Sequence, residues 1–455
     1  MIKHLDAYLD KNIYPFHMPG HKRNEAFFDF EKKLFDYDIT EVDGMDNLHL
    51  PKGIIQELNL RLAETFTNGG ESFLMVNGSS GGIIAAMMSV LSDSDKILVA
   101  RNCHKSVFSG LVFSGAKPVY IYPSVTDMGF AGGIDPAAIE DAFLKDESIK
   151  AIILPSPTYE GLVSDIEKIA QITAKYKKIL IVDEAHGAHF NFNDIFPKSA
   201  MALGADVVIH SLHKTLPTFT QTSVLHVQGT KVDRKRLAAC ISMVQTTSPS
   251  YIFMVAADKC LEFLKKKNSF DSYSKLLQKY RKSFANLNNI KLIGDELKGF
   301  YNIKDIDPSK LTFYMGDTKD IDYTKILREQ FKLEIELKSD AHFVALSSVC
   351  DTAEGFMALE KGVLYLDGLV KPCPPIYTQE NFMTYAKTVL SPREVFGKDT
   401  IEIDIDESAG QISADFVTPY PPGIPVVVPG EVITTQIVGI IKTVLYPSQK
   451  ISILK

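Results

Sequence analysis

The chain has 455 residues, of which 45% are hydrophobic and 23% charged, and its formal net charge is −7. This composition is ordinary for a globular protein, and the length is too great for a single hydrophobic core, so two or more domains are expected. The acidic balance disfavours a nucleic-acid-binding protein, and no apolar run reaches the roughly 18 residues that a membrane span needs.

The chain begins MIKHLDAYLD, in which charged residues appear from the start, unlike a signal peptide. The five cysteines lie far apart and form no CxxC pair, which is typical of reduced thiols. These features predict a cytoplasmic protein that makes no contact with a membrane.

Residues 1–50 are rich in His, Pro and Gly, and we expect them to be irregular. They contain PFHMPGHK and DITEVDGMDNLH, which show neither a helical nor a strand period. Such a segment is predicted to be an arm that lines a site or lies on a partner surface.

From about residue 72, short apolar runs alternate with helical patterns. Helices are predicted at 135–146, which opens with Asp-Pro, and at 165–178. The predicted strands are 72–76, 96–100, 118–122, 151–155, 178–182, 206–210 and 223–227. This alternation predicts an α/β fold with a mostly parallel sheet, in which functional groups collect at the carboxyl ends of the strands.

A change of pattern after about residue 260 marks the end of this region. A charged helical stretch then leads into a smaller α+β region. We therefore expect a large domain at 51–265 and a C-terminal region at 266–455.

Three segments are predicted to meet at one edge of the sheet. The first strand runs into NGSSGG (77–82), whose small residues could cradle a phosphate at a helix start. Another strand ends at Asp183, and the next leads into HSLHK, with Lys214 as its last residue. A phosphate cradle, a carboxylate and a buried lysine are what pyridoxal 5′-phosphate (PLP) requires for its phosphate, ring nitrogen and Schiff base.

Each segment also has an ordinary explanation. GSSGG alone could be a tight strand-to-helix turn, and DEAH at 183–186 occurs in helicases, which also need G-x-x-x-x-G-K-[ST]; that motif is absent here. The pairs His186/His189 and His210/His213 have the spacing of metal ligands on a helix. They follow strands instead, and no Cys or carboxylate completes a set, so no metal site is predicted.

The sequence resembles the ornithine/lysine/arginine decarboxylase family of fold-type I PLP enzymes over nearly its whole length. The resemblance is carried by PFHMPGHK, DITEVDGMDNLH, VNGSSGG, RNCHKS, PTYEG, VDEAHGAHF, HSLHK, TTSPSY, SPRE and PYPPGIP. It is closest to the short bacterial form, which lacks an N-terminal receiver-like domain.

The resemblance implies a role for individual residues. Lys214 resembles the Schiff-base lysine, Asp183 the partner of the pyridine nitrogen, and His104 the histidine stacked on the ring, and these three are the predicted catalytic residues. Glu336 resembles the carboxylate that binds the distal cation of the substrate. The remaining predicted cofactor contacts are Ser79, Ser80, Ala185, His186, Ser211, His213 and Thr246, the last of which resembles a residue that reaches the phosphate of the other subunit.

The resemblance further implies an aspartate-aminotransferase-like fold and decarboxylation of a basic amino acid, with arginine the first choice and then lysine or ornithine. It implies a homodimer with shared sites, or a dimer of dimers. The alternatives are an aminotransferase, in which Arg393 would clamp a carboxylate, a lyase on the same scaffold, and a PLP-binding regulator without turnover.

Overall fold

A seven-stranded sheet forms the centre of the protein. The computed structural model describes residues 2–27, 34–316, 318, 320–371, 386–419, 422–444 and 450–455. In space, the strands follow the order β2-β9-β8-β7-β5-β3-β4. They are β2 (Glu71–Met75), β3 (Lys96–Ala100), β4 (Lys117–Ile121), β5 (Ile149–Pro155), β7 (Ile179–Asp183), β8 (Val207–His210) and β9 (Ser223–Val227).

The sheet is mostly parallel, as predicted, and each apolar run forms one of its strands. Only β9 runs against its neighbours, β2 and β8. Every residue of β8 and β9 is buried, so both faces of the sheet are covered. This burial explains why these strands read as continuous apolar runs in the sequence.

Helices connect and cover the strands. They are α2 (Ile54–Phe66), α3 (Gly78–Val90), α4 (Lys105–Ser114), α5 (Pro136–Lys145), α6 (Ile166–Lys175), α7 (Leu212–Thr215), α8 (Arg234–Val244) and α9 (Tyr251–Leu264). Two of them begin where the sequence predicts. The Asp135 side chain caps α5, with Pro136 in its first turn, and the Asp165 side chain caps α6.

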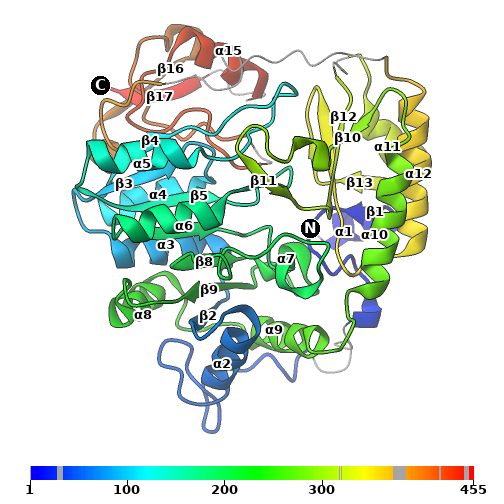
Figure 1. The fold of residues 1–455 in the computed structure, drawn as a ribbon, viewed down its shortest axis with the longest axis horizontal. Helices are drawn as coiled ribbons and strands as arrows, with labels where there is room; N and C mark the ends of the chain where they lie inside the picture. Colours follow the sequence, from blue (N-terminus) through cyan, green and yellow to red (C-terminus); the bar gives the residue numbers. More distant parts are fainter. Residues whose placement is uncertain are drawn as a thin grey trace.

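A second, antiparallel sheet with the order β10-β12-β15-β14 follows the large domain. Its strands are β10 (Lys291–Leu292), β12 (Lys310–Tyr314), β14 (Leu337–Lys338) and β15 (His342–Leu346), and the helices of this region are α10 (Asp271–Phe284), α11 (Tyr323–Phe331) and α12 (Ala353–Asp367). Figure 1 shows α10, α11 and α12 together at one side of the molecule, in green to yellow. A strand of the large domain, β6 (Leu162–Ser164), pairs with β11 (Ile303–Ile306) and so joins the two regions.

The last part of the chain contains α14 (Pro392–Val395), β16 (Thr400–Asp404), α15 (Thr435–Val444) and β17 (Lys450–Leu454). In Figure 1 it lies beside β4, in orange and red. A buried ion pair fixes it there, because the guanidinium of Arg101, just after β3, contacts Glu431 at 2.9 Å. Short 3₁₀ helices are η1 (Glu25–Phe27), η2 (Phe190–Phe192), η3 (Asp295–Leu297) and η4 (Ile405–Glu407).

The N-terminal segment is more ordered than predicted. Residues 1–50 were expected to be irregular, but α1 (Ile2–Leu9) is a helix and β1 (Tyr14–Phe16) pairs in parallel with β13 (Leu333–Ile335). The eight residues of α1 are too few to show a helical period in the sequence. Figure 1 places α1 and β1, in blue, beside the C-terminal sheet, so tertiary pairing supplies the order that the local sequence lacks.

Within the described residues, no helix is both long and apolar enough to cross a membrane. The described cysteines, Cys103, Cys240, Cys260 and Cys350, are buried free thiols. Cys373 lies outside the described residues.

Candidate active site

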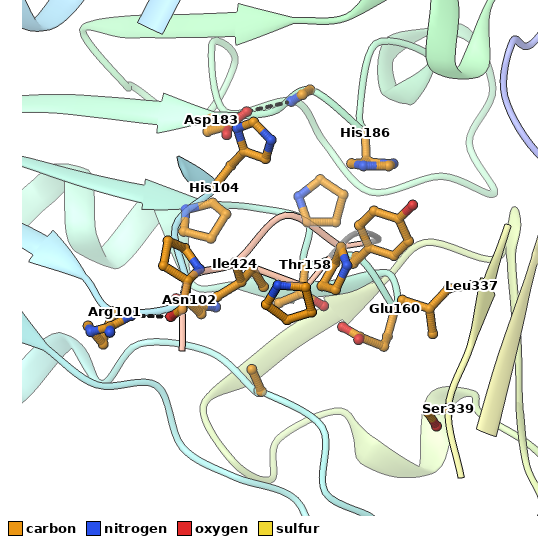
Figure 2. A pocket seen from close by; sticks show the side chains of 18 of the residues that line it. Arg101, Asn102, His104, Thr158, Glu160, Asp183, His186, Leu337, Ser339 and Ile424 are labelled. Carbon is orange, nitrogen blue, oxygen red and sulfur yellow. Dashed lines mark hydrogen bonds between the residues drawn. The ribbon is translucent and has the colours of Figure 1, made fainter. Parts of the chain in front are cut away.

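A cavity of about 450 Å³ lies at the carboxyl ends of β5 and β7. Six of the residues predicted from the sequence line it: Ser79, His104, Asp183, Ala185, His186 and Lys214. Figure 2 shows Asp183 and His104 at its upper left, and Glu160, Leu337 and Ser339 at its lower right. The predicted meeting of the Gly/Ser turn, the carboxylate and the lysine at one edge of the sheet is therefore found in the structure.

The Gly/Ser turn forms the start of α3. Gly78 has a φ of +79°, a left-handed conformation that favours glycine, and it aims the following N–H groups along the start of the helix. The Ser211 hydroxyl donates to the Ser79 hydroxyl at 2.9 Å, which ties α3 to the segment that carries Lys214. Ser80, in contrast, is exposed on the single chain.

Asp183 is the last residue of β7, and only 7% of it is exposed. One carboxylate oxygen accepts from the backbone N–H of Ala185 at 3.1 Å. Burial raises the pKa of Asp183, although the nearby charge of Lys214 acts in the opposite direction. A cation next to this carboxylate would restore its ionised form, which suits the protonated ring nitrogen of PLP.

Lys214 lies in the short helix α7, and burial lowers the pKa of its ammonium. Its Nζ is 3.0 Å from Nε2 of His186. A lowered pKa increases the fraction of uncharged amine, which is the form that attacks a carbonyl. The environment of Lys214 therefore suits a lysine that bonds to an aldehyde.

His104 serves as the N-cap of α4, because its Nδ1 accepts from the backbone N–H of Ser106 at 3.2 Å. Burial, with Lys214 close by, lowers the pKa of His104 to about 4. The ring is therefore neutral near pH 7 and is held on the wall of the cavity, as expected for a ring that stacks on a flat cofactor.

Five of the predicted residues lie outside the cavity lining, and their roles stay predictions: Ser80, Ser211, His213, Thr246 and Glu336. Ser211 acts through Ser79, and Nδ1 of His213 hydrogen-bonds the carbonyl oxygen of Thr222 at 2.8 Å. Thr246 is exposed on the single chain. Glu336 is buried, and its two carboxylate oxygens accept from the Tyr159 hydroxyl at 2.5 Å and from the backbone N–H of Met18 at 2.9 Å.

Glu160 is a carboxylate of the cavity lining to which the sequence analysis gave no role. Burial raises its pKa, so an ionised Glu160 would be stabilised by a cation from a ligand. The pKa of Glu336 is lowered instead, because the Tyr159 hydrogen bond and the charge of Lys310 outweigh the effect of burial. Glu160 lies in PTYEG, one of the motifs that carry the family resemblance, and this motif was the only sequence signal that pointed to it.

Arg101 also lines the cavity, but its guanidinium is already hydrogen-bonded to other groups of the protein. It makes two contacts with Glu431, at 3.1 and 2.9 Å, and donates to the carbonyl oxygens of Pro425 and Val426. Arg393, the residue considered as a carboxylate clamp, is absent from the cavity lining and contacts the carbonyl oxygen of Val112 at 3.5 Å.

The N-terminal arm supports the helix that carries Lys214. The backbone N–H of Gly20 donates to the carbonyl oxygen of His213 at 2.7 Å. A Cβ at Gly20 would come within 2.8 Å of the backbone of Leu216. The Lys22 ammonium donates to the carbonyl oxygen of Leu346 at 2.7 Å, so the arm lies between α7 and the C-terminal sheet. The choice between the two predicted places for the arm, lining the site or lying on a partner surface, stays a prediction.

The residues present fit PLP. The start of α3 with Ser79 offers donors for a phosphate, and Lys214 offers the amine for the aldehyde. Asp183 suits a ring nitrogen. The side-chain carbonyl oxygen of Asn102, also in the cavity lining, is buried without a partner among the described residues. That oxygen could accept a hydrogen bond from a polar ligand.

Comparison with known families assigns most of the chain. Residues 1–312 match the model of the Orn/Lys/Arg decarboxylase major domain, and residues 376–448 match that of the Orn/Lys/Arg decarboxylase C-terminal domain. The chain is 34% identical to an arginine decarboxylase from Bacillus anthracis over 93% of this chain and 88% of that protein. It is 32% identical to an arginine decarboxylase from Bacillus subtilis over 95% and 90%, respectively.

Solved structures agree on the fold. Lysine decarboxylase A from Pseudomonas aeruginosa superposes with a TM-score of 0.79 at 21% identity, over 96% of this chain and 77% of that chain. A ureidoglycine-glyoxylate aminotransferase from Bacillus subtilis superposes with a TM-score of 0.56 at 14% identity, over 79% and 95%. The predicted aspartate-aminotransferase-like fold is confirmed.

Proposed function

Because the chain belongs to the Orn/Lys/Arg decarboxylase family, we propose that it is a PLP-dependent decarboxylase whose preferred substrate is arginine. Its decarboxylation of a basic amino acid follows from the family, whereas the choice of arginine rests on the similar proteins that carry that name. The observation that carries the proposal is the cavity itself, which brings Lys214, Asp183 and Glu160 together.

The residues that would hold PLP follow from the site. Lys214 would bond to its aldehyde carbon, Asp183 would pair with its ring nitrogen, and His104 and Ala185 would pack against its ring. Ser79 would bind the phosphate, supported by Ser211. When bound, PLP accepts the electrons of the bond between Cα and the carboxylate.

The side chains of the protein supply the remaining chemistry. Asp183, ionised, keeps the ring nitrogen protonated. The neutral ring of His104 excludes water from one wall of the site. Once released, Lys214 is positioned to return a proton to Cα, which completes the replacement of the carboxylate by hydrogen.

The substrate preference can be measured directly. We expect CO₂ release with the highest kcat/KM from arginine, then lysine, then ornithine, because a carboxylate can pair with a guanidinium through two hydrogen bonds. The purified protein should absorb near roughly 420 nm, as PLP bonded to a lysine does. Fastest CO₂ release from a neutral or acidic amino acid would overturn the substrate class. Transfer of the amino group without CO₂ would support the aminotransferase alternative, and an absorbing protein without turnover would support the regulator.

We expect Glu160→Gln to raise KM for arginine by about ten- to a hundredfold, which corresponds to the loss of one charge-assisted hydrogen bond. Glu160 and Asp183 both line the cavity, and Glu160 lies away from Asp183 in Figure 2. Glu336→Gln is also expected to raise KM, but by less, since the Glu336 carboxylate already has two donors from the protein. Steady-state kinetics with arginine measures both effects.

The control for this pair is Glu329→Gln, which removes an exposed carboxylate on α11 and should leave KM unchanged. The PLP absorbance should be the same in all three variants, because none of these carboxylates is assigned to the cofactor. An unchanged KM in Glu160→Gln would remove Glu160 from the substrate site.

The aminotransferase alternative has less support from the geometry. A carboxylate clamp needs an arginine with free donors in the cavity, yet Arg101 already pairs with Glu431 and Arg393 is absent from the lining. The predicted homodimer with shared sites stays a proposal. The exposure of Ser80 and Thr246 on the single chain supports it, because both residues are free to meet a partner subunit.

A further inference from the structure

A second buried lysine, Lys310, adjoins the site and has no role in the chemistry described so far. It begins β12 in the C-terminal sheet, and 1% of it is exposed. Its Nζ is 2.6 Å from Nδ1 of His186, while Nε2 of the same ring is 3.0 Å from Nζ of Lys214. His186, labelled in Figure 2, therefore bridges a lysine of the helix α7 and a lysine of the C-terminal sheet.

The bridge limits how many protons these groups can hold. Burial lowers the pKa of His186 well below its usual value, so the ring is neutral. A neutral imidazole has one N–H and one lone pair, and an ammonium can only donate. The ring can thus accept from one lysine only, and it must donate to the other. That second lysine has to be an uncharged amine.

The surroundings favour Lys310 as the charged member. Burial lowers the pKa of Lys310, but the carboxylates of Glu336 and Asp307 limit the change, and the pKa is about 8. Its Nζ also lies 5.2 Å from the centre of the Tyr159 ring, which attracts a cation. The shorter of the two contacts to His186 is the one from Lys310, as expected for a charged donor.

The groups around the bridge come from several elements. Lys214 faces Asp183 and Glu336, and Lys310 also faces Glu160. The titratable and charged groups near the three bridged side chains are His104, Tyr159, Glu160, Asp183, His213, Asp307 and Glu336. Asp183 and, to a smaller extent, Glu336 would favour a charged Lys214, and a bound ring nitrogen would take Asp183 as its partner.

We propose that Lys310, as an ammonium, donates to Nδ1 of His186 and thereby directs the Nε2–H of the ring toward an uncharged nitrogen of Lys214. Lys310 is a positioning residue, because it acts on Lys214 through His186. Its effect is to disfavour a proton on the nitrogen that must bond to the aldehyde of PLP. This inference rests on the proposed function in one respect, because it requires that PLP bind at Lys214.

The first test is a pH titration of the PLP absorbance of the resting holoenzyme, which reports the proton on the Lys214 nitrogen. Lys310→Met keeps the length of the side chain and removes its charge, so the midpoint of the titration should rise by about one pH unit. Lys310→Arg keeps a cation and should hold the midpoint near that of the unaltered enzyme. An unchanged midpoint in folded Lys310→Met would overturn the proposal, whereas a protein without PLP absorbance would count against the proposed function instead.

A second measurement needs no variant of Lys310. Nitrogen NMR of the full-length enzyme labelled at histidine should show His186 with its proton on Nε2 and a bare Nδ1 below about pH 8, where Lys310 is charged. His186→Gln identifies the signal by its disappearance. A His186 ring that carries its proton on Nδ1, or on both nitrogens, would overturn the proposal even if Lys310→Met does not fold.

Discussion

Lys214→Ala is expected to abolish decarboxylation, with a loss of at least about 10⁴-fold in kcat. The cavity lining also contains Lys338, but Lys214 is the lining lysine that contacts His186, and Lys310, the other lysine that contacts His186, is absent from the lining. Borohydride treatment of the unaltered enzyme should fix PLP on Lys214. Peptide mass spectrometry of the reduced protein identifies the labelled lysine.

The control is the fold of the Lys214→Ala protein, measured by circular dichroism and thermal unfolding. α7 is only four residues long, and Leu212 and Thr215 bury it against the core, so loss of the lysine should leave the structure intact. Reduced PLP on Lys310 or on any other lysine would overturn the assignment of Lys214. Mixing Lys214→Ala subunits with inactive Thr246 variants tests the proposed shared sites, since restored activity requires residues from both subunits at one site.

Asp183→Asn is expected to lower kcat by about a thousandfold while PLP still binds. The carboxylate is buried at the end of β7, and burial raises its pKa, so its ionised form depends on an adjacent cation. An amide would not hold a proton on the ring nitrogen of bound PLP, so the ring would accept electrons less readily. Absorbance gives the bound PLP, and CO₂ release gives the rate.

Asp206→Asn is the matched control, because Asp206 is a buried carboxylate next to the same sheet but outside the cavity lining. It accepts from the backbone N–H of Leu180 and pairs with Lys231 at 3.0 Å. This change should lower thermal stability and leave kcat unaltered. A near-normal rate in Asp183→Asn with PLP bound would show that Asp183 is structural.

The sheet and the centre of the site were predictable from the sequence for one physical reason. Parallel strands buried on both faces must be apolar throughout, so each reads as a short continuous run bounded by polar residues. The carboxyl ends of parallel strands lie at one edge, and Ser79, Asp183 and Lys214 each follow such an end, so the sequence could predict that they meet there. The predictions of the cofactor and of the reaction came from the resemblance of the motifs to those of the Orn/Lys/Arg decarboxylase family.

Only the tertiary structure decided which side chains beyond the strand ends reach the cavity. The alternation in EIELKSD (334–340) is typical of an exposed strand, yet Glu336 is buried, because Tyr159 and Met18, which are distant in the chain, hydrogen-bond its carboxylate. Lys310 looks like an ordinary residue at the start of a strand until packing of the second sheet brings it to His186, 124 positions away. Such contacts depend on how two domains pack against each other, and no local period or propensity records that packing.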